Sequence, residues 1–96
     1  MYEVSTMVVT NYMNEFLPEP DIHWPKEEFE KRTYARWAAG EILKRIMDRP
    51  EDDPVKVIDE FSMEVTYYSQ NTEGTPNHLI FETAFETAEQ IGCLFL

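Results

Sequence analysis

Cysteine and glycine are scarce in this sequence, and long apolar runs are absent. The only cysteine is Cys93, so no disulfide can form within one chain and no cysteine cluster can bind a metal. The glycines, Gly40, Gly74 and Gly92, are too dispersed to build a phosphate-binding loop. The N-terminus lacks a signal-peptide pattern, and no apolar run approaches the roughly 20 residues that span a bilayer. We therefore expect a cytoplasmic protein.

Lysine and arginine are also absent from both ends of the chain. All eight lie within residues 26–56, where eight acidic residues balance them. Residues 1–25 contribute a charge of −4 and residues 57–96 contribute −7, so the two ends hold the whole net charge of −11. Nucleic-acid binding depends largely on Lys and Arg that neutralise phosphates, which makes direct binding to DNA or RNA unfavourable. The central bases are interleaved with acids at spacings that permit ion pairs within one helix.

The composition is that of a folded protein. Hydrophobic residues make up 43% of the chain and include thirteen aromatics, which is too rich for a disordered acidic tail. A second core would leave each half too small to outweigh the entropy of ordering it. We expect one helical domain over residues 1–96.

Proline and acidic residues predict where three long helices begin. Pro25 precedes acids in a first helical turn, Asp53–Pro54 combines a capping carboxylate with a proline, and Thr75–Pro76 repeats that signal. Apolar residues recur at spacings of three and four after each start. The predicted helices cover about 25–48, 54–70 and 76–93.

The apolar faces of these helices define the expected core. The face of the first long helix covers nearly half its circumference, so this helix is predicted to be central. Its members are Ala35, Ala38, Ala39, Ile42, Leu43 and Ile46. The second long helix contributes Val57, Ile58, Phe61, Val65 and Tyr68, and the last contributes Ile80, Phe81, Ala84, Phe85, Ala88, Ile91 and Phe95.

The N-terminal segment fits two patterns. Val4, Val8, Tyr12 and Phe16 have the four-residue spacing of a helix, whereas residues 2–12 also alternate like a strand. A single strand would have no partner in a chain that otherwise predicts helices, so we expect a helix over about 4–16. The fold class is therefore all-α, a small bundle of three long helices plus this N-terminal helix.

Three stretches resemble known sequences: WAAGEILKRIMDRP at 37–50, DPVKVIDEF at 53–61, and HLIFETAFETAEQIGCLF at 78–95. Together they resemble small uncharacterised proteins encoded on conjugative and other mobile elements of Gram-positive bacteria. The resemblance extends from about residue 24 to the C-terminus and rests on helix-core patterns with acidic punctuation. It implies an accessory protein of a mobile element, and it implies no activity and no site residues.

Four aromatic or methionine side chains fall outside the core faces. Tyr34 and Trp37 project toward the polar side of the central helix, and Met63 and Tyr67 lie one turn apart on the polar side of the next helix. Exposed groups of this kind mark protein interfaces more often than chance. The alternative is that the N-terminal helix or the proline-rich connection covers them.

Acidic residues form a stripe on the last helix. Glu82, Glu86 and Glu89 lie opposite its apolar face, with His78 one turn before them. This stripe is a candidate partner-binding face or a solvated surface. Metal binding is unfavourable because helical-bundle metal sites project ligands inward from several helices. We expect Cys93 to be a half-buried thiol, since no base stands near it in sequence.

These observations predict a small acidic protein-interaction or regulatory protein that has no catalytic activity, cofactor or metal. Its partner is expected to be a protein, and a homodimer is one form this could take. The first alternative is an acidic nucleic-acid mimic that inhibits a DNA-binding or defence protein. Mimicry requires the acids of the last two helices to merge into one continuous face. The second alternative is a metal-binding or enzymatic bundle with a concave site near His78.

Overall fold

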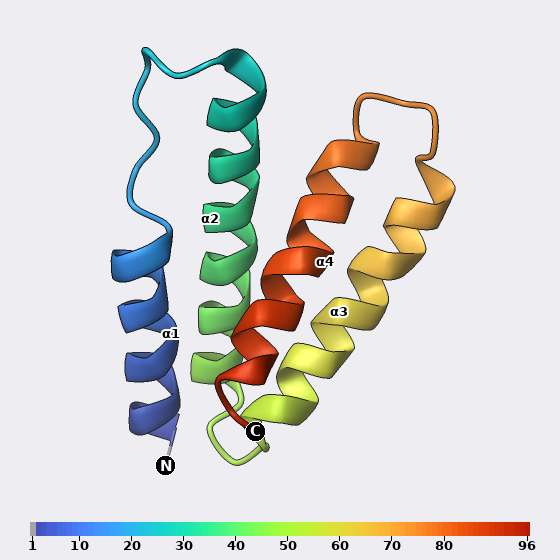
Figure 1. The fold of residues 1–96 in the computed structure, drawn as a ribbon. Coiled ribbons are helices and arrows are strands. Elements are labelled where there is room, and N and C mark those ends of the chain that lie inside the picture. The colour runs from blue at the N-terminus through green and yellow to red at the C-terminus, as the bar shows by residue number, and fades with distance from the viewer. Residues whose placement is uncertain (1) are drawn as a thin grey trace.

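The chain folds into four α-helices and their connections. The computed structural model describes residues 2–96, with side-chain environments from residue 4 onward. The helices are α1 (Tyr2–Phe16), α2 (Lys26–Asp48), α3 (Pro54–Asn71) and α4 (His78–Cys93). In Figure 1, α1 lies beside α2, and α4 lies between α2 and α3. The predicted all-α bundle with an additional N-terminal helix is confirmed, and the part of the chain described contains no strand.

The start of α3 follows from its sequence. Pro54 occupies the first turn, where its missing N–H leaves no donor unsatisfied. Asp53 is the N-cap, and its carboxylate accepts a hydrogen bond of 2.9 Å from the backbone N–H of Val55. This bond satisfies one of the free donors at the helix start. The predicted capping role of Asp53 is confirmed.

The start of α4 differs from the prediction. The helix begins at His78 rather than at residue 76, and Asn77 at its N-cap makes no side-chain capping bond. The Thr75 hydroxyl donates to the carbonyl of Thr72 at 2.7 Å, so it closes the preceding turn and does not cap the helix. Gly74 forms that turn with a φ of 82°.

The core lies where α2 meets α3 and α4. Five α2 residues are buried: Ala35, Ala38, Ala39, Ile42 and Ile46. They belong to one cluster with Val57, Ile58, Phe61 and Val65 of α3 and Ala84, Ala88 and Ile91 of α4. The α3–α4 contact is the most extensive in the bundle, and the α2–α4 contact is next. The largest α3 and α4 side chains therefore meet on one side of α2, which leaves the outer sides of α3 and α4 in solvent.

The predicted N-terminal helix is present, but the four-residue pattern that indicated it does not coincide with its buried face. Val4 is 62% exposed and Phe16 is also exposed, whereas Ser5, Val9 and Tyr12 are buried. Residues spaced by four advance about 40° beyond a full turn at each step, so a stripe from residue 4 to 16 winds around the helix. Contact with α2 selects the Val9 side. Tyr12 also donates a 2.6 Å hydrogen bond to Gln90 of α4.

Gly40 lies inside α2 and offers a simple stability test. A Cβ atom added there would meet nothing within 4 Å. Glycine loses more backbone entropy on folding than alanine does, so Gly40→Ala should raise the free energy of unfolding by about 0.5–1 kcal/mol. Urea denaturation followed by circular dichroism measures the change. The matched control is Gly74→Ala, which should lower stability because of the positive φ at Gly74. Equal effects at the two glycines would contradict this account.

Candidate protein-interaction surface

A shallow groove runs along the outer side of the α3–α4 pair. At one end it is a depression of about 340 Å³ lined by Ser62, Met63, Thr66, Tyr67, Gln70 and Phe85. Met63 is 72% exposed and Tyr67 is 62% exposed. Both side chains point away from the core because α3 buries Phe61 and Val65 on its opposite side. Phe85 of α4 is partly buried and packs against the core, so it supplies a fixed apolar wall.

The depression continues along both helices toward the C-terminal end of α4. A second hollow of about 280 Å³ shares Ser62 and Phe85 with the first. Its other lining residues are Val55, Ile58, Asp59, Ala88, Glu89, Gly92, Cys93 and Leu96. We call the two hollows together the α3–α4 groove. Ile58 and Ala88 give it a buried apolar floor, and Asp59 and Glu89 are exposed on its two sides.

Tyr34 and Trp37, the other two predicted interface residues, lie elsewhere. Tyr34 is half-buried and donates a 3.2 Å hydrogen bond to Glu30. Burial, assisted by Glu30, raises the pKa of the Tyr34 phenol. Trp37 is 43% exposed, and its ring lies 6.1 Å from that of Phe61. Tyr34 and Trp37 of α2 therefore lie on a different part of the surface from Met63 and Tyr67 of α3.

Trp37 borders the proline-rich connection, which was one of the two segments considered as an alternative cover for it. It shares a depression with Glu19 and Pro20 of that connection and with Met13 of α1. The Arg36 guanidinium, in the same depression, approaches Glu19 at 3.8 Å and donates to the Leu17 carbonyl. The connection thus lies against α2 beside Trp37 and leaves part of the indole in solvent.

The acids of α4 point to different neighbours, although all three are exposed. Glu82 lies 3.2 Å from Nε2 of His78, and the other ring nitrogen of His78 lies 2.9 Å from the Ser69 carbonyl oxygen of α3. Glu89 lines the α3–α4 groove, whereas Glu86 lines a cleft on the α2 side of α4. The stripe therefore divides between two surfaces instead of facing one partner.

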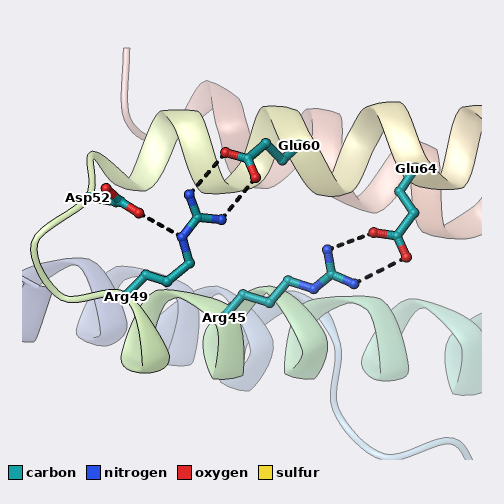
Figure 2. A network of polar contacts seen from close by, with 5 residues as sticks. All are labelled: Arg45, Arg49, Asp52, Glu60 and Glu64. Atoms are coloured by element: carbon teal, nitrogen blue, oxygen red, sulfur yellow. Dashed lines mark hydrogen bonds and ion pairs between the residues drawn. The ribbon is translucent and has the colours of Figure 1, made fainter.

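Two α3 acids pair with arginines, one in α2 and one at its C-cap, as Figure 2 shows. Arg49 donates to both carboxylate oxygens of Glu60 at 2.9 and 3.0 Å, and its Nε donates to Asp52 at 2.6 Å. Arg45 forms a similar pair with Glu64 at 2.9 and 3.3 Å. Planar guanidinium groups suit this two-point contact with carboxylates. These pairs connect two helices, whereas the sequence pattern indicated pairs within one helix, of which Lys31–Glu27 is an example.

The Arg49–Glu60 pair predicts a pH dependence of stability. The hydrogen bonds from Arg49 hold the pKa of Glu60 below its ordinary value. A carboxyl whose pKa is lower in the folded state stabilises the fold above its unfolded pKa, and the contribution disappears as the pH falls through the folded pKa. Glu60→Gln should therefore be less stable than the wild type at about pH 7, with the difference shrinking toward about pH 3.

Urea midpoints measured across that pH range check this expectation. The control is Glu73→Gln, which removes an exposed acid in the α3–α4 turn and should show no comparable pH-dependent difference. A difference between Glu60→Gln and the wild type that stays constant down to about pH 3 would contradict the assigned role of the pair.

A second, more polar cleft of about 460 Å³ lies between α1, the connection, α2 and α4. Its lining includes Tyr12, Trp24, Arg32, Thr87 and Gln90. The Arg32 guanidinium lies 5.0 Å from the centre of the Trp24 ring and donates to the Pro18 carbonyl at 3.0 Å. Burial raises the pKa of Tyr12, against the lowering effect of the Arg32 charge. Sequence patterns did not indicate this cleft, because its residues come from four separate segments.

Metal-ligating side chains and the single thiol were also located in the described part of the chain. Within residues 2–96 no set of three or more His, Cys, Asp or Glu side chains is placed to hold a metal ion. Cys93 is exposed rather than half-buried as predicted, because it faces outward at the end of α4 next to the groove. Its exposure makes the thiol a site for chemical labelling.

Comparisons of the chain with protein-family models, curated proteins and solved structures find no match. Over residues 2–96, none of the helices has both the length and the apolar character needed to cross a membrane. The described features therefore define a small all-α bundle with an exposed apolar groove on its acidic side.

Proposed function

We propose that this protein binds another protein through the α3–α4 groove and acts as an interaction or regulatory protein without catalytic activity. The observation that carries the proposal is the exposure of Met63 and Tyr67 beside Phe85. A flexible thioether and an aromatic ring on a hollowed surface are typical of protein-binding sites, because the thioether adapts to the shape of a partner and the ring buries a large apolar area. The resemblance to mobile-element proteins supports an accessory role in the cytoplasm of a bacterial host.

The nucleic-acid mimic ranks second because the acids do not merge into one face. Glu60 and Glu64 are paired with arginines on the α2 side, and Glu86 faces the polar cleft. A surface that competes with DNA for a basic site needs several uncompensated charges at phosphate-like intervals. Asp59 of α3 and Glu89 of α4 line the same hollow, so these are the two acids that share the α3–α4 groove.

Affinity capture from source cells tests the proposed function. The bait variant carries Met63→Gln and Tyr67→Gln, which remove the exposed apolar groups without changing the net charge. The control carries Met47→Gln, because Met47 is an exposed methionine on α2. The wild type and the control should retain a common protein partner that the double variant loses. Removal of central interface groups commonly costs at least tenfold in affinity. Equal retention by the double variant would refute binding through this groove.

A further inference from the structure

The α3–α4 groove has a length and shape that suit one bound helix. Along α3 its lining positions recur at intervals of three and four, from Val55 to Gln70. Fifteen residues of α-helix rise about 22 Å, so the groove extends over about four helical turns. An amphipathic helix of similar length, placed between α3 and α4, would bury its apolar side on Phe85, Ala88 and Ile58.

The two charged side chains that line the groove are both acidic. Asp59 lies on the α3 side, Glu89 lies on the α4 side, and both are exposed. Residues 57–96 contain seven acids and no Lys or Arg, and the one base of α3, Lys56, is exposed but does not line the groove. Arg45 of α2 and Arg49 at the C-cap of α2 pair with Glu64 and Glu60, which do not line the groove. An occupant of the groove therefore meets apolar side chains below and negative charge on both sides.

We infer that the α3–α4 groove binds an amphipathic helical segment of a partner protein whose polar side is rich in Lys and Arg. This inference rests on the proposed function and names the chemistry of the partner. Complementary charge on both sides of the groove would steer and orient such a helix. A second copy of this chain fits less well, because a two-fold symmetric contact would place each acidic groove against its own equivalent. Nucleic acid and anionic lipid would be repelled because they carry negative charge, as the two sides of the groove do.

The probe is an 18-residue peptide of leucine and lysine that has one apolar side when helical. One control peptide has the same composition in an order that gives no apolar side, and a second has glutamate in place of each lysine. Fluorescence anisotropy of labelled peptides measures affinity at low and at physiological salt. The wild-type protein should bind the amphipathic basic peptide at least tenfold more tightly than either control. Bound peptide should also slow alkylation of Cys93, the only thiol in the chain.

Protein variants locate the binding. Asp59→Asn with Glu89→Gln should weaken the basic peptide about tenfold, since it neutralises both sides of the groove. The matched control, Asp48→Asn with Glu73→Gln, removes the same charge from exposed positions outside the groove. That control should change the affinity less than about twofold. Circular dichroism of every variant confirms that the helices are retained.

Several outcomes would overturn the inference. Equal weakening by the two charge variants would mean general attraction to an acidic protein, and equal binding of either control peptide would mean that charge or helix shape is not recognised. A homodimer in sedimentation that Met63→Gln with Tyr67→Gln dissociates would assign the groove to a second copy. If that double variant loses its cellular partner while the wild type ignores the basic peptide, the proposed function stands and only the partner chemistry fails.

Discussion

Replacing Phe61 with alanine should lower the free energy of unfolding by about 3–5 kcal/mol. Phe61 is 1% exposed and is among the largest fully buried side chains of the bundle. Its ring lies 6.1 Å from the Trp37 ring and 4.9 Å from the guanidinium carbon of Arg45. Truncation to alanine removes the buried apolar area of the ring and leaves a cavity between α2 and α3. It also removes the ring face that the Arg45 guanidinium contacts. Domains of this size have only about 5–15 kcal/mol of stability, so a large share would be lost.

Urea denaturation followed by circular dichroism measures this effect, and a variant on the same helix provides the control. Met63→Ala removes an exposed side chain two residues away and should change stability by less than about 0.5 kcal/mol. The comparison separates the loss of core packing from a general change in helix propensity. Similar losses in Phe61→Ala and Met63→Ala would contradict the placement of Phe61 in the core.

Helix positions were predictable because their signals are local. Asp53 and Pro54 determine the start of α3 through a single hydrogen bond and a fixed φ, and neither effect needs a tertiary contact. The start of α4 was misplaced for a related reason. The Thr75 hydroxyl donates to the Thr72 carbonyl within the turn that contains Gly74 at a positive φ, and the Thr–Pro pattern does not reveal that turn conformation.

The rotation of α1 was not predictable from its own sequence. Its apolar residues are spread around the helix, so no single side is marked as the core face. The choice between the Val4 side and the Val9 side depends on where α2 presents its surface and on the Tyr12–Gln90 bond across 78 residues of sequence. The rotation of a weakly amphipathic helix about its axis is therefore determined by the neighbours it packs against. In α3, by contrast, one apolar stripe already indicates which side of the helix is buried.

The candidate site was half predictable. Met63 and Tyr67 could be identified because they lie opposite Phe61 on a strongly amphipathic helix. The opposite wall of the groove could not be identified from the sequence. Phe85 belongs to the apolar side of α4, and its position beside Met63 depends on how α4 packs against α3. The same limit applies to the Arg45–Glu64 pair, whose partners are 19 residues apart.

Enlarging a small residue in the core should be the second most damaging change. Ala38 of α2 is fully buried, as are Ala39 of α2 and Ala84 and Ala88 of α4, and all four belong to one core cluster. Side chains this small allow close helix contact, and the surrounding core leaves no space for three more carbon atoms. Ala38→Leu should therefore lower the free energy of unfolding by about 1–3 kcal/mol, although leucine is a good helix former and adds apolar area.

The control for Ala38→Leu places the same side chain on the exposed side of the same helix. Lys44→Leu should leave the free energy of unfolding within about 0.5 kcal/mol of the wild type, because Lys44 is exposed. Urea midpoints compare the two variants, and loss of near-ultraviolet circular dichroism in Ala38→Leu would show that the aromatic packing has rearranged. Equal stability of Ala38→Leu and Lys44→Leu would contradict this expectation. It would mean that the core around Ala38 has space for a larger side chain, and α2 could then no longer be described as the central, closely packed helix.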